Sequence, residues 1–144
     1  MPYHIINLFN MEQRDFLMRE IEKIGKMLLA IIGRLKKAVK ADYFEQEIEM
    51  IDTDIISITG ISLKELLRLP EDELLLTLEK TESFDDANLE LFADMLTEIS
   101  SGLDKKESRE TIMKSIRILE MIDSRSRTYS FERQSKLESL RGSL

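Results

Sequence analysis

The sequence predicts an all-α fold built from antiparallel helix pairs, and three observations support this prediction. Apolar residues recur at intervals of three and four in several long segments, which is the spacing of one face of an α-helix. Residues that cap helices stand before most of these segments. Only five Gly and two Pro occur in 144 residues, so residues that break helices are scarce. The 34% of charged residues and 42% of apolar residues suit helices that bury one stripe and solvate the rest.

The first long helix is predicted over residues 11–39. Its main apolar stripe alternates by four and three, as in an antiparallel pair or coiled coil, and comprises Leu17, Ile21, Ile24, Leu28, Ile31, Leu35 and Ala38. A second stripe beside it comprises Met18, Gly25, Leu29 and Ile32, with Met27 adjacent. The wide apolar face indicates a helix with two neighbours. Gly25 and Gly33 weaken a helix interior, so we expect close packing or a bend at these positions.

The second helix follows almost at once, over residues 42–58. Asp42 is its expected N-cap, and Gly60 is placed to end it as a C-terminal glycine. Because the connection is so short, the first two helices are predicted to form an antiparallel hairpin.

A short helical connector is predicted next. Ser62 and Glu65 have the type and spacing of a capping box, which starts a helix that ends before Pro70. Pro70 then stands at the first position of a second short helix that reaches about Lys80.

A second long pair and a capping helix complete the prediction. Ser83 is expected to cap the fifth helix and Gly102 to close it, and Asp104 with Glu107 forms a capping box before a helix that reaches about Arg127. Ser130 is the expected cap of a final helix.

The chain shows no interdomain linker, so residues 1–144 are expected to form a single domain. Residues 1–10 and 142–144 are expected to be frayed.

Charge is distributed unevenly along the chain. The net charge of −7 divides into +4 for residues 1–40, −14 for residues 41–103 and +3 for residues 104–144. Basic ends around an acidic middle indicate either separate binding surfaces or acidic helices that lie between basic ones within the fold. The second interpretation is the simpler one.

Several stretches carry a resemblance to known proteins. Ala41-Asp42-Tyr43-Phe44-Glu45 after a basic helix end is similar to the middle of a tetratricopeptide (TPR) helix pair, although Gln46 and Glu47 stand where a small residue is expected. Most of the chain resembles an uncharacterised family of small bacterial all-helical proteins with TPR-like helix pairs. That resemblance rests on residues 15–22, 89–96 and 129–134. It implies a TPR-like right-handed helical array with a connector and a C-terminal capping helix, and it implies no activity or functional residues.

No pattern for metal binding or catalysis stands out. The chain has no Cys, and its single histidine, His4, has no Glu-x-x-His partner motif. The acidic residues Glu45, Glu47, Glu49, Asp52 and Asp54 spread around a helix, which indicates a solvated face. Tyr129 and Arg127 near Glu132 are explained by helix-end charge and capping. We therefore predict a non-enzyme with no catalytic residues, metal ligands or cofactor.

The N-terminus lacks a basic region followed by a long apolar core, and no apolar run approaches the ~18 residues of a membrane span. We therefore expect a cytoplasmic protein without a membrane partner.

Two functions remain. The first is a protein–protein interaction module, because stacked helix pairs present grooves to peptides or helices. The alternative is a nucleic-acid-associated regulator that uses the basic C-terminal third, although the overall acidity and the absence of interleaved aromatic residues disfavour nucleic acid. The basic residues concerned are Lys105, Lys106, Arg109, Lys114, Arg117, Arg125, Arg127, Arg133, Lys136 and Arg141.

A homodimer is predicted through the first helix. Its main stripe suffices to pack against the second helix, so the second stripe (Met18, Met27, Leu29 and Ile32) needs another cover. A second copy of the chain in a symmetric dimer could cover this stripe, and the competing explanation is that the fifth helix of the same chain covers it.

Overall fold

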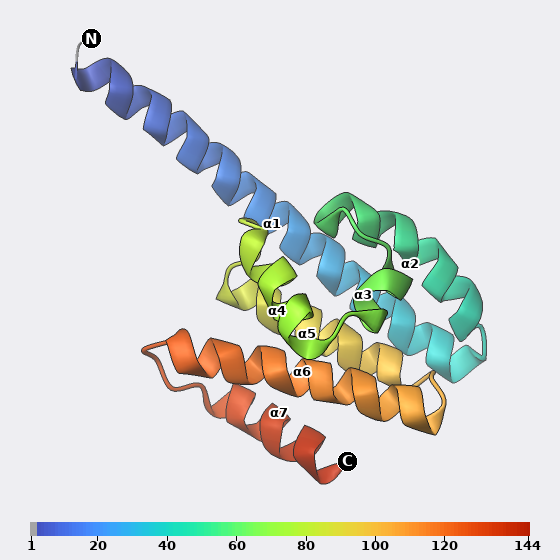
Figure 1. Cartoon of the computed structure of the whole chain (residues 1–144). Coiled ribbons are helices and arrows are strands. Elements are labelled where there is room, and N and C mark those ends of the chain that lie inside the picture. The colour runs from blue at the N-terminus through green and yellow to red at the C-terminus, as the bar shows by residue number, and fades with distance from the viewer. Residues whose placement is uncertain (1–2) are drawn as a thin grey trace.

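The computed structural model describes the backbone of residues 3–144 and the side chains from Asn10 onward. This part of the chain is all-α and contains no strand (Figure 1). Its helices are α1 (Tyr3–Ala41), α2 (Phe44–Thr59), α3 (Leu63–Arg68), α4 (Glu71–Lys80), α5 (Asp86–Ser100), α6 (Lys105–Arg125) and α7 (Phe131–Gly142).

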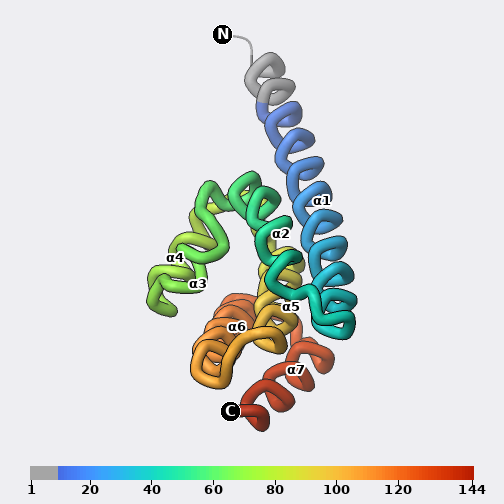
Figure 2. The backbone as a smooth tube through the Cα atoms, turned by 90° about the vertical axis from the view of Figure 1, so that its right-hand side faces the viewer, coloured from blue at the N-terminus to red at the C-terminus, as the bar shows by residue number. Residues whose placement is uncertain are grey.

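The helices pack as two pairs with a connector and a final helix. α1 packs against α2, and α5 packs against both α6 and α1, so the two pairs meet through α1 and α5. The short helices α3 and α4 lead from the first pair to the second, and α4 packs on α6 (Figure 2). α7 also packs on α6. One cluster of buried apolar side chains includes residues from every one of these helices.

The predicted core stripe of α1 is confirmed from Ile24 onward. Leu28 and Leu35 are fully buried, and Ile24 is nearly so. In contrast, Leu17 and Ile21 are only half-buried, because the outer half of α1 extends beyond the other helices (Figure 1).

The second stripe of α1 is divided between core and solvent. Ile32 is buried and Met27 is partly buried against the same core, so the chain itself covers these two residues. Met18 and Leu29 are exposed.

The two glycines within α1 differ in their surroundings. A Cβ added to Gly25 would lie 2.9 Å from Oδ1 of Asn88, which confirms close packing there. A Cβ on Gly33 would meet open space.

Several helix ends follow the predicted chemistry. The side chains of Ser62, Asp104 and Ser130 accept hydrogen bonds from backbone N–H groups three residues later, at the starts of α3, α6 and α7. Gly60 ends α2 with φ 79°, a left-handed conformation that glycine adopts without steric cost.

Two predicted caps are wrong. Asp42 does not cap α2: its φ of 62° places it in the left-handed region, and α2 begins at Phe44. A short polar side chain tolerates that conformation better than most, so Asp42 serves the tight turn between α1 and α2. Ser83 does not cap α5 either. Asp85 accepts the hydrogen bond from the N–H of Asn88, and Ser83 instead offers its carbonyl to the Asn88 side chain.

The outer boundaries also differ from the predicted ones. α1 begins at Tyr3 rather than near Met11, and residues 1–2 lie outside the described part, as do the side chains of residues 3–9. At the other end α7 continues through Gly142, and the N–H of Ser143 still donates to the carbonyl of Leu140. None of the described helices is both long and apolar enough to span a bilayer.

Candidate protein-binding grooves

The basic ends and the acidic middle of the chain bind one another. From residues 1–40, Arg34 pairs with Glu47 and Asp54, and Lys36 approaches Glu98. Residues 104–144 contribute matching pairs to the acidic middle, namely Arg117–Asp72, Arg125–Asp86, Arg133–Glu90, Lys136–Glu90 and Lys136–Asp94. The contacts favour the interpretation that the charge asymmetry serves internal complementarity.

The most buried of these pairs join α5, α6 and α7. Arg133 is buried, and its guanidinium donates to Asp123 at 2.5 Å and to Glu90 at 3.4 Å. Burial alone would raise the pKa of Asp123, but hydrogen bonds from Arg133 and Gln134 outweigh it and lower that pKa. Burial raises the pKa of Asp94, although a nearby lysine on α7 partly offsets the effect. The cluster holds α7 onto the second helix pair.

These pairs also occupy much of the basic surface that the nucleic-acid hypothesis requires. Besides Arg133, Lys114 is buried and donates to the carbonyl of Leu67. Burial lowers the pKa of Lys114. A shallow hollow of about 490 Å³ at the start of α6 is lined by Lys105, Lys106, Arg109 and Glu110, so a carboxylate shares even this basic part of the surface.

The acidic residues of α2 are divided among different roles, so the predicted solvated face is only partly observed. Glu47 is buried, and its Oε1 lies 2.7 Å from Nε of Arg34. Asp52 accepts from the backbone N–H of Leu63 at 2.7 Å and so fixes the start of α3. Glu45 and Glu49 face a groove instead.

That groove lies between α2, α3, the turn that joins α5 to α6 and the first two turns of α6; we call it the α2–α3 groove. Its volume is about 680 Å³, within the range of ligand-binding clefts. Apolar residues from all sides line it: Phe44, Ile48, Leu67, Ile99 and Leu103. The floor therefore offers apolar contacts to a bound segment.

The rim of the α2–α3 groove is acidic. Its carboxylates are those of Glu45, Glu49, Asp104, Glu107 and Glu110. Only two cationic residues, Lys64 and Arg68, share the lining. Negative charge therefore predominates around an apolar floor.

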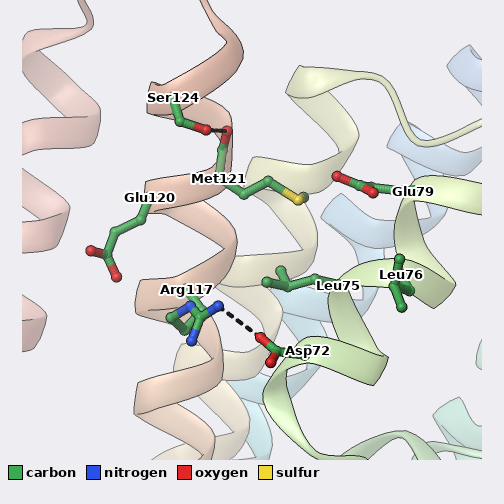
Figure 3. Close-up of a pocket in the computed structure, with 8 residues that line it drawn as sticks. All are labelled: Asp72, Leu75, Leu76, Glu79, Arg117, Glu120, Met121 and Ser124. Atoms are coloured by element: carbon green, nitrogen blue, oxygen red, sulfur yellow. Dashed lines mark hydrogen bonds and ion pairs between the residues drawn. The ribbon is translucent and has the colours of Figure 1, made fainter.

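A second groove lies between α4 and α6, the α4–α6 groove, with a volume of about 740 Å³. Leu75 and Met121 project into the space between the two helices (Figure 3). Nη2 of Arg117 lies 2.9 Å from Oδ1 of Asp72, which neutralises part of its rim. Its lining also holds the carboxylates of Glu79 and Glu120, and it has fewer apolar residues than the α2–α3 groove.

Neither groove is predicted by the sequence. Phe44 stands out there only within the TPR-like stretch of residues 41–45, and Leu67 and Leu103 lie near helix ends whose neighbours depend on the tertiary arrangement. Tyr129, beside Arg127 and Glu132 in sequence, is exposed. Within the described residues no group of three or more His, Asp or Glu side chains is arranged to hold a metal ion.

The comparisons with known proteins found no matching family model, no matching curated protein and no matching solved structure.

Proposed function

We propose that this chain is a non-catalytic protein-interaction module with TPR-like helix pairs, and that its α2–α3 groove binds a basic amphipathic segment of another protein. The observation that carries the proposal is the combination of an apolar floor with a predominantly acidic rim. An amphipathic helix inserts apolar side chains at positions i, i+3, i+4 and i+7 into such a floor. Lys or Arg beside those anchors meets the carboxylates of the rim.

The roles of the ionisable groups support a module without catalysis. Perturbed pKa values gather at functional sites but also in structural ion-pair networks. Here Asp94, Asp123, Arg133 and Lys136 belong to the network that joins α5, α6 and α7. Lys114 fastens α6 to the end of α3. None of these five lines the α2–α3 groove.

A defined peptide tests the proposal directly. The probe is a fluorescein-labelled helix-forming 14-mer with Leu at one face and Lys elsewhere, and its counterpart carries Glu in place of every Lys. We expect the Lys peptide to bind saturably in fluorescence anisotropy and the Glu peptide not to bind. The double variant Glu45→Lys/Glu49→Lys should weaken binding of the Lys peptide about ten-fold or more, a change of about 1.4 kcal/mol.

The matched control is Glu82→Lys/Glu138→Lys, which changes the net charge equally at two exposed positions outside both grooves. It should bind the Lys peptide nearly as tightly as the unaltered chain. Equal weakening by both double variants would mean general charge attraction and would refute the groove. Ile48→Ser, in the apolar floor, should weaken binding without altering charge.

The nucleic-acid alternative is tested in the same assay. A labelled 24-base-pair duplex of random sequence is titrated at low and at physiological salt. Tight binding that falls steeply as salt rises would favour the alternative. We expect weak binding, because several basic residues of the C-terminal third pair with carboxylates.

A further inference from the structure

Three helices enclose the α2–α3 groove and give it two distinct ends. α2 and α6 meet at one end, where the ring of Phe44 lies against Gly102 just before α6; we call this the α2–α6 corner. At the other end α3 bridges the two helices, and Figure 1 shows it between them. Asp52 on α2 accepts from the first backbone N–H of α3 at 2.7 Å, and Lys114 on α6 donates to the carbonyl of Leu67 on α3.

The carboxylates of the rim are spaced along α2 and α6. Glu45 lies in the first turn of α2, and Asp104 and Glu107 lie at the start of α6, so all three stand at the α2–α6 corner. Glu49 and Glu110 follow about one turn later on the same two helices, toward α3. All five side chains are exposed. The corner therefore carries three negative charges, and the α3 end carries two.

The cations of the lining stand at the α3 end. Lys64 and Arg68 are four residues apart on one face of α3, and both are exposed. Their two positive charges balance those of Glu49 and Glu110, so the α3 end is neutral. At the α2–α6 corner, the partial positive charges of the N-termini of α2 and α6, roughly +0.5 each, offset about one of the three negative charges. The groove is therefore negative at the corner and neutral at α3.

Other cations at the start of α6 face away from this groove. Lys105, Lys106 and Arg109 line the separate hollow of about 490 Å³ described above. Exposed charges are screened by salt over about 8 Å at physiological ionic strength. A segment bound in the α2–α3 groove therefore responds mainly to the charges of the groove's own lining.

We propose that the α2–α3 groove takes its helical partner in one direction, with the partner's N-terminal half, rich in Lys or Arg, at the α2–α6 corner and its C-terminal end against Lys64 and Arg68. This inference rests on the proposed function, because it presupposes that the groove binds a basic helix. The N-terminal end of a helix is electropositive and its C-terminal end presents unpaired carbonyl groups. The opposite direction would bring the electronegative end to the carboxylates and the electropositive end to the two cations.

Two peptides of equal composition test the direction at physiological salt. Each is a helix-forming 14-mer with the same Leu face, acetylated and amidated so that its termini are uncharged. One carries Lys in the N-terminal half and Gln in the C-terminal half, and the other has the two halves exchanged. In isothermal titration calorimetry we expect the first to bind at least about three-fold more tightly, through several individually weak ion pairs. Lys near the N-terminus weakens a free helix, so intrinsic helicity would favour the other peptide.

Charge reversal on α3 tests the residues that set the direction. Lys64→Glu/Arg68→Glu should reverse the preference, because the α3 end then becomes more negative than the α2–α6 corner. The readout is the ratio of the two affinities, which a general gain of negative charge does not change. The matched control is Lys23→Glu/Lys26→Glu, an equal change at two exposed positions of α1, and it should leave the ratio as it is.

A nitroxide label at either end of the first peptide tests the direction by a second measurement. A label at the C-terminal end should broaden the amide NMR signals of residues 63–68, and a label at the N-terminal end those of residues 101–104. Equal affinities of the two peptides, a ratio unaffected by Lys64→Glu/Arg68→Glu, or the exchanged pattern of broadening overturns the direction while the proposed function stands. Binding of neither peptide overturns the proposed function and the direction with it.

Discussion

The backbone of Gly102 lies directly against the aromatic ring of Phe44. A Cβ placed on Gly102 would overlap atoms of that ring. This contact brings the turn after α5 against the start of α2 and sets one wall of the α2–α3 groove.

Gly102→Ala is therefore expected to destabilise the fold by about 1–3 kcal/mol, the usual cost of an added methyl in a packed contact. In a Phe44→Leu background the same substitution should cost less, because the ring it collides with is gone. Gly33→Ala is the control: open space surrounds that position, and Ala should stabilise the helix by up to about 1 kcal/mol. Urea unfolding of these variants measures the differences. A Gly102→Ala cost that is unchanged by Phe44→Leu would contradict the contact.

Leu28→Ala is expected to lower the free energy of unfolding by about 2–5 kcal/mol, because it empties a fully buried site in the centre of α1. Leu29→Ala, one position further along the helix, removes an exposed side chain and should cost far less. Thermal melting of both variants decides the matter. Equal melting temperatures of the two variants would contradict the burial of Leu28 and the exposure of Leu29.

The stability of the fold is expected to depend on the side-chain NH2 group of Asn88. Its side-chain amide donates to the carbonyls of Ile21 and Ser83, both at 2.9 Å, and the residue is buried. Asn88→Asp replaces this donor with an oxygen that faces two carbonyl oxygens, so we expect a loss of about 1–3 kcal/mol near neutral pH. Chemical denaturation checks the size, and Asn10→Asp, the same change at an exposed position of α1, serves as the control. A similar small effect of both substitutions would exclude the buried hydrogen bonds.

Asp123 should make the stability depend on pH. Its pKa is lowered in the folded protein from the ordinary 3.8, so its contribution is present above that value and is lost as pH falls through the lowered pKa. Asp123→Asn should therefore cost about 1–3 kcal/mol at a pH of about 6, and the cost should shrink at the lowest pH where the protein still folds. Paired unfolding curves at several pH values measure it. A cost independent of pH would mean that the carboxylate charge plays no part.

The sequence predicts those features that depend on local spacing. The burial of Ile24, Leu28 and Ile31 follows from a three-and-four repeat, and the caps at Ser62, Asp104 and Ser130 follow from side chains within three residues of their partners. Contacts between helices cannot be predicted in this way, because they depend on residues that are distant in sequence. Glu47, Lys114 and Arg133 look like ordinary surface residues in sequence, yet each is buried because a partner on another helix meets it.

The same distinction explains the errors and the unpredicted grooves. Asp42 and Asp85 are both good capping residues by type, and only the backbone path shows that the first takes a left-handed turn while the second caps α5. The α2–α3 groove combines residues 44–49 with residues 99–111, which no periodicity relates. Its apolar floor could be assembled only once the α1–α5 packing was known.

The order of the helices along the chain has a consequence for how the protein folds. α5 and α6 are neighbours in sequence, joined by one short turn, and they pack against each other. The contact between α1 and α5, by contrast, forms only when the chain of residues 42–85 between them closes into a loop. Contacts between residues near in sequence cost less loop-closure entropy than contacts between distant residues, and they form earlier. We therefore expect α5 and α6 to form the folding nucleus and α1 to dock afterwards. Amide hydrogen exchange in the native protein should then be slowest in α5 and α6 and fastest in the outer turns of α1.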